Sequence, residues 1–211
     1  MEKSHQGLIT ALDLSPQEHV AVVGGGGKST LCFALAEALR LKGARVISTT
    51  TTKVRHEEAK TYPRLVLYPP GESDLEAVKK GLHEAGNVFV GQEFLKNGKV
   101  EGISSTAADD LFRMPGVDYV IIEADGAAGR PLKAPADHEP VIPRSVTCVI
   151  AVMGLEALGK PLGPDMVFRP ALFKALTGLK EGDILNPEGL VWAFDGKAGL
   201  FKNTPASARR M

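Results

Sequence analysis

The 211-residue sequence predicts an α/β protein, with a P-loop-like three-layer arrangement of helices around a mainly parallel sheet. Three observations indicate this class. Short Val- and Ile-rich runs alternate with helix-like segments, a run of four glycines joins the first strand to a helix, and a later strand ends in acidic residues and glycine. The expected strands lie at residues 20–23, 44–48, 65–68, 87–92, 119–122 and 146–152.

The glycine run is the strongest chemical signal in the chain. Residues 19–30 read HVAVVGGGGKST, which is the order strand, glycine loop, Lys-Ser and helix of a phosphate-binding loop. Glycines allow backbone N–H groups to curl toward an anion, and the helix N-terminus adds unpaired donors and partial positive charge. We therefore predict a nucleotide-phosphate site made by Gly24, Gly25, Gly26, Gly27, Lys28, Ser29 and Thr30.

Within that site, Lys28 is expected on the terminal phosphates and the Ser29 hydroxyl on Mg²⁺. The spacing departs from the usual G-x-x-x-x-G-K-[ST], because Val22 stands where the first glycine belongs. The loop is therefore expected to be tighter than usual. The alternative interpretation is a strand-to-helix turn that binds nothing.

The helix after the loop is expected over residues 29–42, with Gly43 following its end, because apolar residues recur there at helical spacing. A short helix is expected before the first strand, ending near Ser15 and Pro16.

Hydroxyl groups end the second expected strand. Thr49, Thr50, Thr51 and Thr52 follow it and lead to Lys53, beside the glycine-loop strand in a sheet of this kind. We assign Thr50, Thr51 and Lys53 to the nucleotide site, with Thr51 also near the metal. The alternative is that the threonines serve only as good strand formers.

Acidic residues end the strand at 119–122. Glu123 and Asp125 alternate along extended chain and should therefore project to the same side. A carboxylate at this position beside a phosphate loop can hold Mg²⁺ or polarise the attacking nucleophile. We predict Lys28, Glu123, Asp125 and Arg130 as catalytic residues, and Ser29, Thr51 and Glu123 as metal ligands. The alternative is a pair of solvated acids at the strand end.

Residues 127–145 contain four prolines and are expected to form a long ordered loop, which in a compact protein is usually functional. Arg130 and Lys133 are placed to close over phosphate. His138, between two acids, is a candidate general base or metal ligand, although a loop histidine held by hydrogen bonds is the commoner case.

The remaining elements have weaker signals. A helix over residues 73–84 is expected with Ser73 as its cap, and a helix from Ser105 or Thr106 runs through Phe112. Asn97-Gly98 predicts an added antiparallel hairpin. Two further helices are expected at 171–176 and 186–194, and the tail after them is expected to be loop.

Composition limits the classes of function. Lys and Arg together number 25, as do Asp and Glu, so the net charge is zero and neither nucleic acid nor a membrane surface is an expected partner. No apolar stretch is long enough for a membrane span, and the N-terminus lacks the pattern of a signal peptide, so a cytoplasmic location is expected. Cys32 and Cys148 are expected to be buried small hydrophobes.

Three segments together resemble one known family. GGGGKST, VISTTTTK and IIEADGAAGRPLKAPADHEPVIP resemble the YqeC family of selenium-dependent molybdenum hydroxylase accessory proteins, over about residues 18–205. The resemblance implies a single P-loop NTPase-like domain over residues 1–211, ATP or GTP as ligand, Mg²⁺, and a molybdenum hydroxylase or its cofactor as partner.

The segment IIEADG is also similar to the acidic strand end of nucleotide-driven metallochaperones, in which hydrolysis accompanies delivery and often homodimer formation. Members of the YqeC family continue with an Asn-Lys-x-Asp-like segment that selects guanine. The chain ends at Met211 without it, so either the chain is truncated or this member lacks the element, and ATP and GTP both stay open.

The leading hypothesis is a slow Mg²⁺-dependent NTPase that acts as a switch in maturation of these hydroxylases. A non-catalytic carrier of a pterin dinucleotide or another anion is one alternative. A small-molecule kinase, with its acceptor held by residues 130–138, is the other.

Overall fold

The computed structural model describes residues 2–68, 75–195 and 198–211. Its main sheet, among these residues, has seven parallel strands in the order β11-β9-β1-β7-β2-β5-β4. These strands are β1 (Glu18–Gly24), β2 (Val46–Thr50), β4 (Leu65–Leu67), β5 (Asn87–Gly91), β7 (Tyr119–Glu123), β9 (Cys148–Val152) and β11 (Arg209–Arg210). The prediction of a mainly parallel α/β sheet is confirmed.

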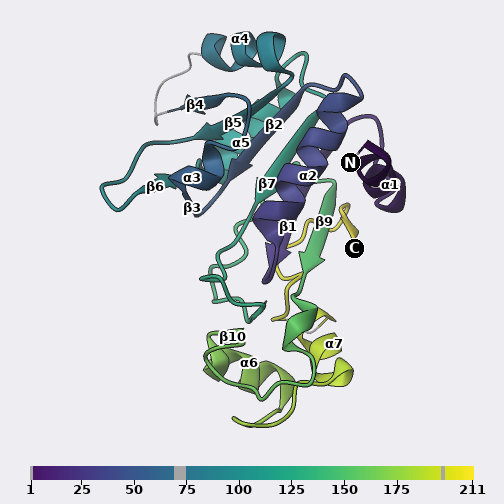
Figure 1. The fold of residues 1–211 in the computed structure, drawn as a ribbon, viewed down its shortest axis with the longest axis vertical. Coiled ribbons are helices and arrows are strands. Elements are labelled where there is room, and N and C mark those ends of the chain that lie inside the picture. The colour runs from purple at the N-terminus through teal and green to yellow at the C-terminus, as the bar shows by residue number, and fades with distance from the viewer. Residues whose placement is uncertain (1, 69–74, 196–197) are drawn as a thin grey trace.

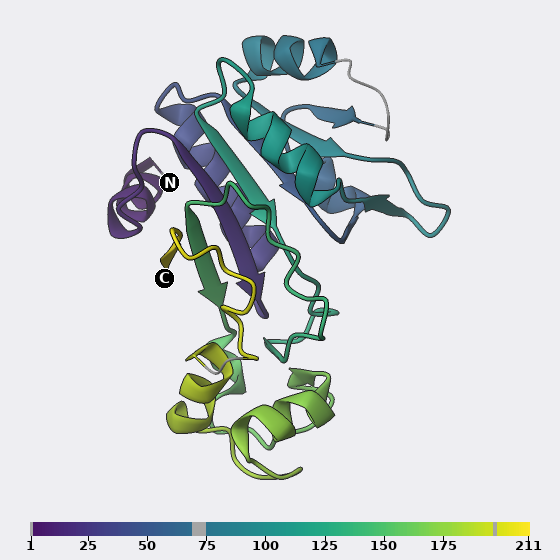
Figure 2. The same ribbon diagram turned by 180° about the vertical axis from the view of Figure 1, so that it is seen from behind.

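Helices cover both faces of this sheet (Figures 1 and 2). On one face, α2 (Lys28–Leu41) packs on β1, β2 and β7, and α1 (Glu2–Ala11) packs against α2. Their apolar cluster includes Val20, Leu35 and Ile121. The other face carries α4 (Glu76–Ala85) and α5 (Ser105–Arg113), whose buried residues join those of the sheet, for example Leu82, Leu111 and Ile122. The layers are therefore helix, sheet and helix.

The helix after the glycine loop lies close to its predicted position, with Gly43 at φ +85° after its end. Other boundaries differ from the sequence predictions. Helix α5 is capped by Ser104, whose hydroxyl accepts from the N–H of Ala107 at 3.1 Å, and not by Ser105 or Thr106. Ser73, the predicted cap of α4, lies outside the described residues.

The hairpin around Asn97-Gly98 forms and acquires an additional partner. Strand β6 (Lys99–Glu101) turns back beside Phe94 and also pairs antiparallel with β3 (Lys53–Arg55). The helix α3 (His56–Ala59) follows β3 directly. Strand β3 and helix α3 follow the carboxyl end of β2, so these elements border the edge of the sheet where the predicted site lies.

Residues 127–145 and the C-terminal third differ most from expectation. Within the proline-rich loop, β8 (Leu132–Lys133) pairs with β10 (Val167–Phe168). The tail was expected to be loop, but β11 adds an edge strand to β9 because backbone pairing there needs no sequence signature.

A smaller lobe lies at the carboxyl ends of β1 and β9, at the foot of Figure 1. It contains a 3₁₀ turn (Leu155–Ala157), β10, α6 (Pro170–Thr177) and α7 (Pro187–Asp195), and it has an apolar cluster of its own that includes Leu132, Leu162 and Phe173. Across the described ranges, no helix has the length and apolar character needed to cross a membrane.

Candidate functional site

A cleft of about 900 Å³ lies at the carboxyl ends of the central strands. Its walls come from the start of α2, the segment after β2, the end of β7 and the loop after it, and the end of β10. Ligands of open parallel sheets bind at this edge. The predicted residues on its walls are Gly26, Gly27, Lys28, Ser29, Thr30, Thr51, Lys53, Glu123, Arg130 and His138.

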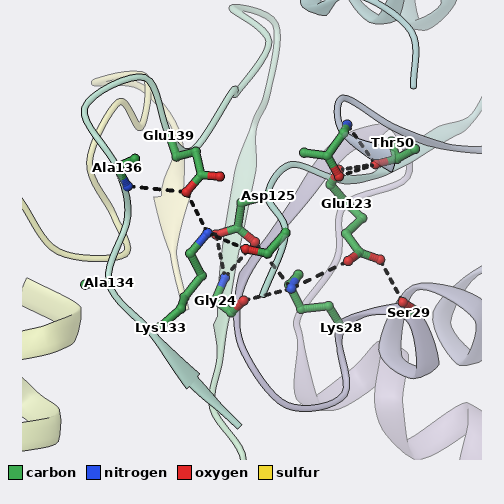
Figure 3. A network of polar contacts seen from close by, with 12 residues as sticks. Gly24, Lys28, Ser29, Thr50, Glu123, Asp125, Lys133, Ala134, Ala136 and Glu139 are labelled. Carbon is green, nitrogen blue, oxygen red and sulfur yellow. Dashed lines mark hydrogen bonds and ion pairs between the residues drawn. The ribbon is translucent and has the colours of Figure 1, made fainter. Parts of the chain in front are cut away.

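Lys28 is held at the centre of the site (Figure 3). Its ammonium group is almost fully buried, donates to the carbonyl oxygen of Gly24 at 2.7 Å, and lies 3.5 Å from Glu123 and 3.4 Å from Asp125. Both carboxylates of the alternating pair thus approach one lysine. The position of β1 beside β7 in the sheet causes this convergence, because Val22 pairs with Glu123.

Ser29 faces the end of β7. Its hydroxyl donates to a carboxylate oxygen of Glu123 at 2.9 Å. Burial raises the pKa of Glu123, and the neighbouring Lys28 and the Ser29 hydroxyl partly offset that effect. The structure thus places a hydroxyl and a carboxylate, two hard oxygen ligands, side by side at the first turn of α2.

The glycine loop is closed by the backbone of neighbouring segments. The N–H of Gly24 donates to both oxygens of Asp125, that of Gly25 to the carbonyl oxygen of Val152 at 2.9 Å, and that of Gly26 to Arg130 at 3.1 Å. Three of the four glycine amides therefore point into the protein. Among the described residues, the N–H of Gly27, which precedes α2, has no backbone partner.

The glycines are required by these close approaches. A Cβ added at Gly25 would lie 2.7 Å from the carbonyl oxygen of Pro131, and one at Gly26 would lie 2.4 Å from the nitrogen of Gly154. Gly24, Gly26 and Gly27 also have positive φ, which glycine adopts without strain.

Asp125 begins a buried row of alternating charges. It is fully buried and lies 3.0 Å from Lys133, whose ammonium group also contacts Glu139 at 2.9 Å and donates to the carbonyl oxygen of Gly126. Glu139 in turn pairs with Arg169, next to β10. Although burial acts against ionisation, the hydrogen bonds from Arg169 and Lys133 lower the pKa of Glu139 to about 2.

These contacts change the interpretation of several predicted residues. Lys133 was expected to close over phosphate, but it is fully buried between Asp125 and Glu139. The long-range pairing that fixes it has no local sequence signal. Glu139 and Arg169 were not predicted at all, and only the mixture of charges in a proline-rich loop indicated that this segment is ordered.

The threonine hydroxyls at the end of β2 mainly donate to backbone carbonyl oxygens. The buried Thr50 hydroxyl donates to the carbonyl oxygen of Glu123, and that of Thr51 to the carbonyl oxygen of Val141, both at 2.9 Å. Thr50 does not line the cleft, whereas Thr51 does. Lys53 lies at the rim, 3.2 Å from Glu101.

Arg130 and the exposed His138 both line the cleft on the loop after β7. Within the described part of the chain, no ion pair involves the Arg130 guanidinium group. The same residues contain no group of three or more His, Cys, Asp or Glu side chains suited to a metal ion.

Comparison with known proteins agrees with this arrangement of motifs. The profile of the family described as "YqeC protein" matches residues 20–171, which contain the glycine loop, the threonine strand end and the acidic strand end. The chain belongs to the YqeC family. It is 37% identical over 203 residues to the "Uncharacterized protein YqeC" of Escherichia coli (strain K12), a match that covers 95% of this chain and 77% of that protein.

The resemblance to the YqeC family inferred from the sequence is thus confirmed. No solved structure matches the chain significantly. All the residues that line the cleft lie within the range that the family profile matches, so the cleft of this YqeC family member is its leading candidate site.

Proposed function

We propose that the cleft binds a nucleoside triphosphate together with Mg²⁺, and that slow hydrolysis makes the protein a switch. The observation that carries the proposal is the group formed by Lys28, Ser29 and Glu123 at the start of α2, with the two side-chain contacts of Glu123 at 2.9 and 3.5 Å. A cation, a hydroxyl and a carboxylate in this arrangement match the needs of a magnesium–phosphate complex.

The residues fit Mg²⁺ in the way that this ion is usually bound. Magnesium commonly takes one or two protein oxygens and completes its shell with waters and substrate phosphates. Ser29 and Glu123 would supply those oxygens, and the ion would neutralise charge on the phosphates. The hydroxyl of Thr51 donates to the carbonyl oxygen of Val141, so in this proposal Thr51 shapes the cleft wall beside the metal.

The residues of this chain would bind and orient the phosphates. Free N–H groups at the start of α2 and the ammonium group of Lys28 provide positive charge, once Lys28 leaves the Gly24 carbonyl. Glu123 and Arg130 both line the cleft; in this proposal Glu123 would orient an attacking water and Arg130 would stabilise charge on the terminal phosphate.

A role in the maturation of selenium-dependent molybdenum hydroxylases is the biological part of this proposal, and it depends on the family resemblance alone. It includes a hydroxylase or its cofactor as partner and homodimer formation during the cycle. Bound ATP and GTP are equally compatible with the walls described above.

One observation favours a second candidate, a non-catalytic anion carrier. The N–H groups of Gly25 and Gly26 donate to the carbonyl oxygens of Val152 and Arg130 and are therefore not available to a ligand. A small anion that used only the N–H groups at the start of α2 could bind without breaking these bonds and opening the loop. A carrier should bind its anion with little dependence on metal.

The test is a calorimetric titration with non-hydrolysable ATP and GTP analogues, each with Mg²⁺ and with EDTA. The proposal expects binding that weakens by about tenfold or more without Mg²⁺, because the ion, held by Ser29 and Glu123, would offset the negative charge of the phosphates. Ser29→Ala should remove most of that metal dependence, whereas Ser104→Ala, at the cap of α5, should leave it unchanged. Equal affinity with and without Mg²⁺ would favour the carrier, and the absence of binding to either analogue would contradict the nucleotide switch.

A further inference from the structure

A second, smaller cavity of about 340 Å³ adjoins the cleft on the side of β2 and α3. Its walls are three aromatic rings, Phe33, Tyr62 and Phe89, together with the small apolar groups of Cys32, Val54 and Ala59. Tyr62 packs against both of the other rings, with centroid separations of 5.4 Å to Phe33 and 5.1 Å to Phe89. Nothing in the proposed nucleotide site accounts for this aromatic cavity.

The cavity communicates with the cleft through a polar boundary. Ser29, Thr30, Val54, Glu58 and Glu123 line both spaces. A molecule in the aromatic cavity would therefore approach the proposed phosphate and metal ligands from the side opposite Arg130 and the lobe.

The polar groups at the boundary carry negative charge. Glu58 of α3 is half-buried, and Glu123 is 13% exposed. Burial above all raises the pKa of the Tyr62 phenol well above 10, with Glu123 and Glu58 contributing, so this ring stays neutral. Aromatic walls beside carboxylates attract a flat ring that carries N–H donors or a positive charge, and they repel a carboxylate of the same shape.

We infer that this cavity binds a second ligand, a planar aromatic or heteroaromatic molecule of one or two rings with an amino group directed at Glu58. A volume of this size is enough to hold such a ring system. The ring packs on the aromatic wall formed by Phe33, Tyr62 and Phe89, its amino nitrogen donates to Glu58, and the phosphates of a nucleotide occupy the neighbouring cleft at the same time.

The inference is tested with 2-aminobenzimidazole as the probe and benzimidazole-2-carboxylate as its anionic counterpart. Binding to the full chain is measured by calorimetry and by ligand-observed NMR. The amino compound is expected to bind at least about tenfold more tightly than the carboxylate, in line with a charge-assisted hydrogen bond.

Two pairs of matched variants locate the probe. Phe33→Ala is expected to weaken binding by about fivefold, and Glu58→Gln by about tenfold. The matched controls are Phe94→Ala, beside α3, and Glu57→Gln, within α3; both positions are exposed and do not line the cavity. They are expected to change the affinity for the probe by less than about twofold. Phe33→Leu, which keeps an apolar side chain, should retain the fold if Phe33→Ala does not, and circular dichroism checks each variant.

The outcomes separate this inference from the proposed function. Probe binding without any nucleotide binding would support the ligand site in the aromatic cavity and contradict the nucleotide switch. Nucleotide binding with no detectable probe binding, equal binding of the two probes, or equal losses in the control variants would overturn the inference. So would mutual exclusion of the probe and the ATP analogue, because the cavity would then hold part of the nucleotide.

Discussion

The ammonium group of Lys28 bonds the carbonyl oxygen of Gly24, four residues before it, at 2.7 Å. The lysine thus closes its own loop, and Glu123 and Asp125 hold it from the β7 side. A phosphate that engages Lys28 must compete with these three partners. The balance between them and the ligand should therefore set nucleotide affinity.

Replacing Lys28 should abolish nucleotide binding. Lys28→Ala removes the only cation within 4 Å of both Glu123 and the Gly24 carbonyl in the described contacts, and leaves two carboxylates to repel phosphate. We expect affinity for a Mg²⁺–ATP analogue to fall by at least about a hundredfold, as measured by calorimetry. Lys42→Ala, at the opposite end of α2, is the control and should bind normally. Unchanged affinity of Lys28→Ala would count heavily against a phosphate site in this loop.

A methyl group at Gly25 should disrupt the closed loop. Its Cβ would lie 2.7 Å from the Pro131 carbonyl oxygen and 2.9 Å from that of Arg130, both of which are backbone atoms. We expect Gly25→Ala to lower the free energy of unfolding by about 1–3 kcal/mol, from urea denaturation. Gly126→Ala is the matched control, because a Cβ there meets nothing within 4 Å and φ is not positive. Equal stabilities of the two variants would show that the loop is not packed as described.

Lys133 should be essential for stability. Its fully buried ammonium group lies between Asp125 at 3.0 Å and Glu139 at 2.9 Å. Lys133→Met preserves most of the volume but leaves two buried carboxylates short of a partner, at a cost of about 3–5 kcal/mol. Lys174→Met, at a half-exposed ion pair on α6, should cost less than about 1 kcal/mol. Chemical denaturation of both variants measures the difference, and a small loss for Lys133→Met would contradict the buried charge row.

The stability of the protein should fall as pH decreases from about 6.5 to 4 because of His19. This residue is fully buried at the start of β1, and burial, opposed by the charge of Asp109, lowers its pKa to about 4. Between these pH values the His19 side chain is protonated in the unfolded chain but not in the folded protein. This difference lowers the free energy of unfolding by about 3 kcal/mol. Stability due to neutral His19 is complete above pH 6.5 and lost below pH 4.

Urea titrations at a series of pH values measure this dependence. His19→Gln cannot take up the proton and should flatten the curve between pH 6.5 and 4, even if it is less stable at neutral pH. His138→Gln, in an exposed position, should keep the slope of the parent protein. A parent curve that is flat over this interval would show that His19 titrates normally.

Local patterns predicted the fold where a signal is continuous along the chain. The helical periodicity after Lys28 and the apolar run ending in Glu123 gave elements close to those observed. Ser104 was missed as a cap because several neighbouring hydroxyl residues satisfy the same rule. Strand β11 was missed because two arginines in a tail carry no strand pattern, and their pairing depends on the free edge of β9.

The candidate site was predictable to the extent that its residues sit beside glycine or at a strand end. Lys28, Ser29 and Glu123 could be named on this basis. The buried role of Lys133 and its partners could not be predicted, since Lys133, Glu139 and Arg169 come together only when β8 pairs with β10. The same holds for Phe33, Tyr62 and Phe89, whose rings come from three separate elements of the chain.

The short pairing of β8 with β10 has a mechanical consequence. It fastens the loop that carries Arg130 to the C-terminal lobe, and Glu139 with Arg169 adds a second attachment. A ligand that broke the hydrogen bond between the Gly26 N–H and the Arg130 carbonyl would therefore disturb a loop that is attached directly to the lobe. The exposed Val191 and Trp192 of α7 belong to this lobe, so the β8–β10 pairing and the Glu139–Arg169 ion pair connect the glycine loop to that surface.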